Sequence, residues 1–366
     1  MSPDVFIAGG GPAGSAAAIL LARAGVRVTL AEKRREAHHK VCGEFVSGEA
    51  VETARDLGLD LSALGAVPIQ VVAYATPSGG VVRRTLPFPA VSLSRLVLDE
   101  ALLGAAEAAG ARVLRGVSVQ GFDLDPDGGT TVRLDGDGPV QVPAFFAATG
   151  KHDLRGHARP EGRQGDLVGL KMLYRRAVAP SDPVVTIVPF RDGYAGLQPV
   201  GQDAVNLCLL VSRRRFADHG GRFDDLVRSL VAEAPEIARQ LDGAEPLLDK
   251  ALAVTRIPYG YVRRVTEGPW WLGDQAAVIP SFAGDGIAIA LESARQAVDT
   301  LLSGGTAAGY QRRFASTVSR QVGAATVLSQ LMVRPSWQRP SALLAAVPGV
   351  LAGIGLLTRV RLPTGA

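Results

Sequence analysis

The first thirty residues alternate between short apolar runs and a helical repeat. Residues 5–8 form a β-prone apolar run that ends in glycines, and residues 13–24 carry Ala and Leu at helical spacing. Gly25 then ends the helical pattern, and residues 26–31 have the composition of a second strand. The pattern predicts a βαβ unit with a tight glycine turn between its first strand and its helix.

A similar alternation continues through the next third of the chain. Residues 93–109 place apolar side chains on one helical face, and residues 112–114 begin another strand. Residues 130–142 alternate around Asp135-Gly136-Asp137-Gly138, which predicts a hairpin. The apolar run 145–148 predicts a further buried strand.

The predicted secondary structure changes between residues 165 and 257, where most segments have the composition of β-strands. We expect strands at 184–188 and 205–211 and one helix over 223–241. A buried strand at 270–272, a glycine-rich turn and a helix over 287–302 follow. The last sixty residues are predicted to be mostly helical.

The apolar stretch 342–357 is shorter than the ~20 residues that a membrane-spanning helix needs. Pro348, Gly349, Gly353 and Gly355 also interrupt it. We interpret it as a buried helical tail, with peripheral contact at a membrane surface as the alternative.

Composition excludes several classes of protein. The chain is 47% hydrophobic and only 20% charged, which argues against a disordered or fibrous protein. The net charge of +4 is spread along the chain and aromatic residues are 5%, so no nucleic-acid partner is predicted.

The cysteines and the N-terminus bear on the cellular compartment. Cys42 and Cys208 are far apart and form no CxxC, which favours a reducing cytoplasm over a disulfide scaffold, and no metal site is predicted. Because the chain passes directly from Met1 into a strand, we expect no signal peptide and a cytoplasmic location.

The first chemical motif is Gly9-x-Gly11-x-x-Gly14, with Glu32 at the end of the next strand. Gly9 permits the turn, Gly11 lets the backbone approach a pyrophosphate, and Gly14 lets the helix pack closely on the strand. The helix N-terminus faces the phosphates, and Glu32 accepts hydrogen bonds from ribose hydroxyls. Its carboxylate disfavours a 2′-phosphate, so the tightly held nucleotide is not expected to be NADP.

The second motif is GDQAAVIPSFAGDGIAIALESA, which begins at Gly273-Asp274 and contains Pro280, Gly284 and Gly286. It resembles the second FAD fingerprint of glutathione-reductase-type flavoproteins, which include single-component flavin hydroxylases and geranylgeranyl reductases. The resemblance implies that Asp274 binds a ribityl hydroxyl and that the following helix points its N-terminus at the flavin.

The same resemblance supplies further candidates for cofactor contacts. Arg95, at the start of the helix over 93–109, matches the place where the family has an arginine near FAD, with an ordinary surface arginine as the alternative. Thr149 and Gly150 match the ATG segment on the adenine side. The candidates beside the first motif and after the second strand are Pro12, Ala13 and Lys33.

Three residues are candidate catalytic groups. Lys40-Val41-Cys42-Gly43-Glu44 resembles the cysteine-containing segment beside the flavin in geranylgeranyl-reductase-like proteins, so Cys42 and Glu44 are candidates for tuning the flavin, orienting substrate or relaying a proton. The alternative is a buried Cys and a loop-capping Glu. Tyr194, with Gln198 nearby, resembles the substrate-domain strand that faces the flavin, with structural packing as the alternative.

Two further residues have side chains that could take part in catalysis, and several positions depart from the motifs of flavin hydroxylases. His152 is a candidate base or an exposed loop histidine, and Cys208 is interpreted as a core residue within an apolar strand. Ala277 stands where many hydroxylases carry His, and Lys151-His152-Asp153 replaces their Asp-Gly fingerprint. A second GxGxxG is absent, as is the WxWxIP signature of flavin halogenases.

We therefore predict an α/β protein with a Rossmann-type FAD-binding domain, an inserted β-sheet substrate domain and C-terminal helices. The family fold implies an FAD-binding domain from 1–66, 92–158 and 262–315, a substrate domain from 67–91 and 159–261, and a helical region over 316–366. The expected function is FAD-dependent oxidation of a lipophilic small molecule, most simply by a monooxygenase that NAD(P)H reduces transiently. The alternatives are a reductase that saturates isoprenoid double bonds and a non-catalytic flavin-binding protein.

Overall fold

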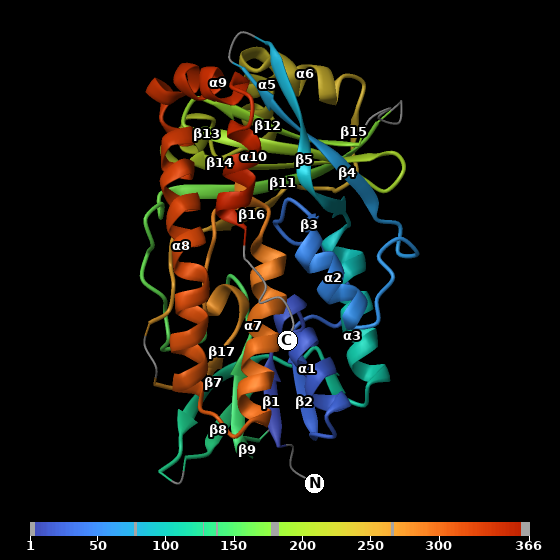
Figure 1. The fold of residues 1–366 in the computed structure, drawn as a ribbon, viewed down its shortest axis with the longest axis vertical. Helices are drawn as coiled ribbons and strands as arrows, with labels where there is room; N and C mark the ends of the chain where they lie inside the picture. Colours follow the sequence, from blue (N-terminus) through green and yellow to red (C-terminus); the bar gives the residue numbers. More distant parts are fainter. Residues whose placement is uncertain are drawn as a thin grey trace.

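The computed structural model describes residues 4–76, 79–126, 128–136, 138–176, 183–264 and 267–359. Two sheets lie one above the other along the long axis of the molecule, and a long C-terminal helix runs beside both (Figure 1). Asp137, part of the predicted hairpin turn, and residues 360–366 of the predicted helical region lie outside the described residues.

The lower sheet is parallel and has the strand order β17-β10-β1-β2-β6. Its strands β1 and β2 are buried along their whole length, as expected of a parallel sheet covered on both faces. Helices α1, α3 and α7 pack together beside it, and the small antiparallel sheet β7-β8-β9 adjoins it. The strands and helices of this half are β1 (Val5–Ala8), α1 (Pro12–Arg23), β2 (Val28–Glu32), α3 (Arg95–Ala108), β6 (Arg112–Arg115), β7 (Val119–Leu124), β8 (Thr130–Leu134), β9 (Val140–Val142), β10 (Ala144–Ala147), β17 (Trp270–Trp271) and α7 (Gly286–Leu302).

The upper sheet is mixed, with the order β15-β11-β14-β13-β12-β4-β5-β3 and with β16 paired to β11. Helices α5 and α6 cover one face, where alternate strand residues form an apolar core. The elements of this half are β3 (Phe45–Ser47), α2 (Gly48–Asp56), β4 (Val67–Ala75), β5 (Val81–Ser92), β11 (Leu167–Arg175), β12 (Val184–Phe190), β13 (Gly193–Val200), β14 (Ala204–Ser212), α4 (Arg213–Asp218), α5 (Phe223–Glu233), α6 (Pro235–Leu241), β15 (Glu245–Pro246) and β16 (Leu252–Thr255).

The strands of each sheet come from separate stretches of sequence. Strand β3 lies within the predicted N-terminal FAD segment but pairs with β5 of the upper sheet. It therefore carries the chain from the parallel sheet to the second one. The predicted domain boundaries themselves remain a proposal.

The predicted helix over 223–241 is wrong in one respect, because the structure divides it into α5 and α6. Pro235 has no N–H to donate and disfavours a helical conformation in the residue before it. Ala234 accordingly takes extended angles, with φ −120° and ψ 95°, and the helix restarts at Pro235.

The C-terminal region is helical, as predicted, but its last apolar stretch is not a buried tail. After α8 (Ala307–Val333), the chain forms α9 (Gln338–Ala346) and α10 (Val350–Thr358), which pack beside β4 and β5. Leu343 is 73% exposed, and Leu344, Val347, Leu356 and Leu357 are also exposed. Two short helices joined at Pro348-Gly349 have too little partner surface to bury every apolar side chain.

Within the described residues, no single helix is long and apolar enough to cross a membrane. Only the pair Pro335–Ala346 and Val350–Thr358 meets that test together, and it is bent by 105°.

Candidate functional site

The glycine turn between β1 and α1 has the geometry that the first motif predicts. Gly9 has φ +106°, and a Cβ there would lie 2.4 Å from the Ala148 carbonyl oxygen. A Cβ on Gly14 would lie 1.9 Å from the Gly9 carbonyl oxygen, so helix and turn could not pack as they do. Pro12 opens the helix at a position where its missing N–H costs nothing.

Glu32 ends β2 beside this turn and is nearly fully buried. One carboxylate oxygen accepts a hydrogen bond from the Gly10 N–H at 2.9 Å, and the other accepts from the Arg34 N–H at 3.0 Å. A hollow opens beside the carboxylate. Its lining includes Gly10, Glu32, His38, Lys40, Leu96 and Leu103. Two backbone N–H groups thus fix the orientation of the Glu32 carboxylate, which borders the hollow on the side of the sheet where a nucleotide is expected.

The second motif lies beside the first. Gly273 has φ +57°, and a Cβ there would lie 3.1 Å from the Cβ of Ala13. Pro280 is buried and precedes a short turn that ends at Gly284, whose φ is +71° and which packs against the Phe45 ring. Gly286 then opens the 17-residue helix α7.

Arg95 connects the glycine turn to the Cys42 loop. Its guanidinium forms a two-point ion pair with Asp99, with distances of 2.6 and 2.8 Å, and it hydrogen-bonds the Cys42 side chain. Burial works against its charge, but Asp99 and Cys42 outweigh burial and raise the pKa of Arg95. The alternative of an ordinary surface arginine is therefore wrong.

The remaining predicted cofactor contacts lie near the same strand ends. Thr149 and Gly150 follow β10; the Thr149 hydroxyl donates to the His152 carbonyl oxygen at 2.6 Å, and Gln275 donates to the Gly150 carbonyl oxygen at 2.8 Å. Lys33 is exposed directly after β2. His152 is exposed, which agrees with the simpler interpretation of a loop histidine.

These residues fit FAD by three observations. A Cβ on Gly11 would meet only the Arg95 guanidinium, 3.8 Å away, and a Cβ on Gly286 would meet nothing within 4 Å, so both backbones border open space. The Asp274 carboxylate receives no hydrogen bond from any described residue. A pyrophosphate at Gly11, a ribityl hydroxyl at Asp274 and a flavin at the N-terminus of α7 are compatible with this arrangement.

Glu44 lies at the junction of the two sheets and is 0% exposed. Its carboxylate Oε1 accepts from the Lys171 ammonium at 2.5 Å and from the Arg95 N–H, the first residue of α3, at 2.9 Å. Lys171, on β11, is also 0% exposed. Glu44 is not only the loop-capping residue of its alternative interpretation, because it is half of a buried ion pair, accepts the first N–H of α3 and has a left-handed φ of +64°.

Cys42 lies two residues earlier and remains partly exposed. Its Sγ accepts the Glu44 N–H at 3.3 Å, in addition to the contact with Arg95. Lys151 donates to the Val41 carbonyl oxygen at 2.8 Å and so helps to fix the loop. The Cys42 thiol thus lies among hydrogen-bond donors, close to the Gly11 turn that Arg95 also approaches.

One face of the upper sheet holds the Cys42–Glu44 loop. Asn206 on β14 donates to the carbonyl oxygens of Cys42 and Gly43, each at 3.0 Å. Gln198 is paired with Asn206 in the sheet register and donates to the Ser92 hydroxyl at 2.7 Å. Because strand residues alternate, these polar side chains lie on the face opposite the core under α5 and α6.

Tyr194 and Cys208 lie on the same face. Tyr194 is buried, its hydroxyl accepts from the Phe282 N–H at 3.3 Å, and burial raises its pKa. This arrangement agrees with the packing alternative for Tyr194. Cys208 is paired with Lys171 in the register and is only partly exposed; it lies on the face opposite the core under α5 and α6. Burial, followed by the nearby Cys42, raises its pKa to about 12.

Arg359, near the end of the chain, reaches the loop that precedes α7. Its guanidinium pairs with Glu49 of α2, with one contact at 2.9 Å, and lies 3.6 Å from the Asp285 carboxylate. It also stacks on the Phe88 ring at 3.7 Å. The end of α10 is thereby fastened to the segment that the second motif assigns to the flavin.

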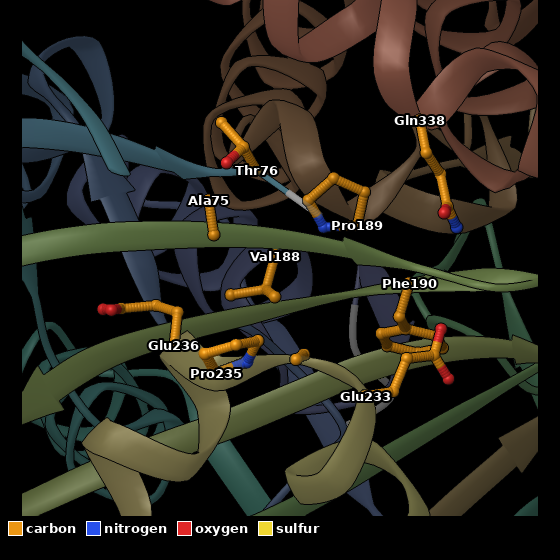
Figure 2. A pocket seen from close by; sticks show the side chains of 10 residues that line it. Ala75, Thr76, Val188, Pro189, Phe190, Glu233, Pro235, Glu236 and Gln338 are labelled. Atoms are coloured by element: carbon orange, nitrogen blue, oxygen red, sulfur yellow. The ribbon is translucent and has the colours of Figure 1, made fainter. Parts of the chain in front are cut away.

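A separate hollow lies at the edge of the apolar core on the opposite face of the upper sheet (Figure 2). Its carboxylates are already paired, Glu233 with Arg215 and Glu236 with Arg239. The residues that line it are Ala75, Thr76, Val188, Pro189, Phe190, Glu233, Ala234, Pro235, Glu236 and Gln338. It does not adjoin the Cys42–Glu44 loop. Elsewhere too, the described residues contain no cluster of three or more His, Cys, Asp or Glu suited to a metal.

Sequence reasoning missed Lys171, Asn206 and Arg359. A signal existed for Lys171, because a lysine within the otherwise apolar run LVGLKML requires a partner if the strand is buried. Asn206 and Arg359 carry no such signal, since their partners are 163 and 310 residues away.

Comparisons with known proteins add evidence on the cofactor. Residues 2–152 match the model of a family described as FAD binding domain. The chain is 28% identical to a menaquinone reductase of Mycolicibacterium smegmatis over 337 residues, covering 82% of this chain and 77% of that protein. It is 27% identical to a menaquinone reductase of Mycobacterium tuberculosis over 361 residues, covering 91% and 85%.

Solved structures share the fold. The flavin-dependent brominase Bmp2 has a TM-score of 0.78 at 19% identity, with 98% of this chain and 93% of that chain covered. A variant of Pseudomonas aeruginosa PqsL has a TM-score of 0.77 at 17% identity, with 94% and 100% covered. The myxobacterial halogenase CndH has a TM-score of 0.76 at 18% identity, with 97% and 91% covered.

The glycine turn, the Asp274 segment and these comparisons lead to one conclusion. The protein is an FAD-dependent oxidoreductase with a mixed α/β fold.

Proposed function

We propose that the protein is an FAD-dependent reductase that saturates a carbon–carbon double bond in a lipophilic, isoprenoid-bearing substrate, with a prenylated quinone or its quinol as the first candidate. The observation that carries the proposal is the Cys42–Glu44 loop, which places a thiol beside the predicted flavin site. Sequence similarity to menaquinone reductases over most of the chain supports the same reaction class.

Saturation of a double bond requires one hydride and one proton. Bound FAD, once reduced, supplies the hydride equivalent. The proton then comes from the protein, and we assign it to the Cys42 thiol, which is partly exposed and held by Arg95 and the Glu44 N–H. Lys171 and Asn206 hold the loop in place.

The test is an anaerobic single turnover of chemically reduced holoenzyme with a prenylated naphthoquinol in deuterated water, because the quinol ring cannot itself oxidise the flavin. The proposal predicts a product with two added hydrogens, both of them deuterium because the N–H of reduced flavin and the thiol exchange with solvent, and flavin that becomes oxidised in step with product. A product that has gained oxygen, or formation only when oxygen is admitted, contradicts the proposal.

A monooxygenase is the second candidate, and NAD(P)H as transient reductant remains a prediction for either reaction. The observation that favours it is the match of residues 2–152 to the FAD binding domain family. The same assay in air separates the two candidates, because a monooxygenase consumes one oxygen molecule for each product. Halogenation receives no support from the sequence, which lacks the WxWxIP signature.

We further propose that α9 and α10 contact an anionic bilayer from which a lipophilic substrate is taken up. The segment 335–358 contains no acidic residue and exposes Leu343, Leu344 and Leu356. Arg339 within it and Arg334 directly before it are also exposed. Holoenzyme should float with vesicles that contain phosphatidylglycerol. Substitution of Leu343 and Leu344 by Asp should abolish flotation, whereas Leu124→Asp, at an exposed leucine on β7, should not. Equal flotation of all three proteins would contradict the contact.

A further inference from the structure

The Cys42–Glu44 loop and β14 present buried hydrogen-bond acceptors that no described residue uses. Glu44 Oε2 and Asn206 Oδ1 are both shielded from solvent and lack a donor. Both side chains are at most 1% exposed, and Asn206 contacts the two residues immediately before Glu44 through its Nδ2. Buried polar atoms in folded proteins nearly always have a partner, so these two neighbouring acceptors are free to receive a donor that is not part of the chain.

The charges around these acceptors restrict what the donor is. Lys171 occupies the other oxygen of Glu44 and neutralises it, so a metal ion or an organic cation would meet an ammonium group in a buried setting. The ring of His39 also lies near this pair; burial and then Lys171 lower its pKa, which favours the neutral ring. A neutral O–H group is therefore the suitable donor.

We propose that Glu44 Oε2 and Asn206 Oδ1 form a subsite for a hydroxyl group of the substrate, which enters as a phenol or quinol and not as a quinone. This inference rests on the proposed function, because it assigns the oxidation state of the ring that carries the prenyl chain. A hydroxyl held here lies beside the Cys42 thiol. A carbonyl oxygen in the same place would face two acceptors and gain no hydrogen bond.

The backbone carbonyl oxygens of the same loop offer no competing subsite for this group. The carbonyl oxygens of Cys42 and Gly43 are already used by Asn206, and that of Val41 by Lys151. Glu44 Oε2 and Asn206 Oδ1 are therefore the atoms at this place that can distinguish a substrate hydroxyl from a carbonyl or an ether.

The test measures binding without turnover, so it does not depend on the reductase chemistry. Oxidised holoenzyme is titrated with 1-naphthol and with 1-methoxynaphthalene, and the change in the flavin absorbance spectrum is followed. The two probes differ by the single O–H donor, and neither is oxidised or reduced in the experiment. The subsite predicts that 1-naphthol binds about 10- to 100-fold more tightly than its methyl ether.

Two variants test the assignment to these atoms. Glu44→Gln replaces an acceptor by an amide, and the double variant Glu44→Gln with Lys171→Met removes both charges if the single variant does not fold. Each should lower the preference for 1-naphthol at least about tenfold. Asn206→Leu should do the same, whereas Gln311→Leu should not, although Gln311 is likewise a buried amide with an unpartnered oxygen.

Three results would overturn the subsite. Equal affinity of the two probes in the unmodified protein would show that the acceptors form no hydrogen bond with the hydroxyl of 1-naphthol. An unchanged preference in the Glu44 and Asn206 variants would place the discrimination elsewhere. Loss of FAD from these variants, with the preference intact in the holoenzyme that remains, would assign the acceptors to the flavin. A failed double-bond reduction with a retained 1-naphthol preference would instead reject only the proposed reaction.

Discussion

The β1–α1 turn and the Cys42–Glu44 loop meet through Arg95, yet they are built on different principles. The turn is specified by glycines within six residues, and its contacts are made by backbone atoms. The loop is held by side chains from β11, β14 and α3, more than fifty residues away at the least. A cofactor common to many enzymes can be bound by a local backbone motif, whereas the groups that decide the reaction depend on long-range packing.

The largest effect should follow from filling the turn. Gly14→Val places side-chain atoms where even a Cβ would lie 1.9 Å from the Gly9 carbonyl oxygen. We expect FAD affinity to fall by more than about 100-fold, measured by flavin content after purification and by titration with FAD. Gly104→Ala is the control, because a Cβ there meets nothing within 4 Å and the residue lies within α3. Full flavin occupancy in Gly14→Val would contradict the geometry.

The next effect should come from the loop. Lys171→Met leaves the fully buried Glu44 carboxylate without its charged partner, which should lower the free energy of unfolding by about 3–5 kcal/mol. The double variant with Glu44→Gln should recover most of this loss in urea unfolding. Arg228→Met removes an exposed partner of Asp225 and should cost at most about 1 kcal/mol. Equal losses in Lys171→Met and Arg228→Met would show that burial of the pair is unimportant.

A smaller effect is expected where the chain end meets the second motif. Arg359→Ala removes the hydrogen bonds to Glu49 and the nearby charge at Asp285, at an estimated cost of about 1.5–3 kcal/mol in the free energy of unfolding. FAD should also dissociate faster, because the segment before α7 is less restrained. An unchanged dissociation rate would confine the role of Arg359 to packing against Phe88.

The smallest effect concerns Cys208. Because its pKa is raised to about 12 in the folded protein, the thiol stays protonated at pH 8 and should resist iodoacetamide, as read by mass spectrometry. A raised pKa in the folded state means that this group contributes stability below its unfolded pKa near 9 and loses it as pH rises toward 12. Rapid alkylation of Cys208 at pH 8 in the folded protein would contradict its assigned surroundings.

The two regions also differ in how far the sequence predicts them. Val5–Ala8, the turn at Gly9–Gly14 and the helix α7 follow from local patterns, and the structure confirms them within a few residues. The break at Pro235 was foreseeable from proline chemistry, although the apolar periodicity concealed it. The partners of Glu44 were not, because pairing with Lys171 depends on how the two sheets pack, which no local spacing encodes.

The measurement that tests this division most directly uses two quantities, FAD affinity and the rate at which a prenylated naphthoquinol reoxidises the reduced flavin without oxygen. Both are compared between the unmodified protein and Glu44→Gln. The account predicts FAD affinity within about threefold of the unmodified protein, since the turn is intact, and reoxidation slowed by at least about tenfold. Loss of both in parallel, or unchanged reoxidation, would contradict the separation of cofactor binding from reaction chemistry.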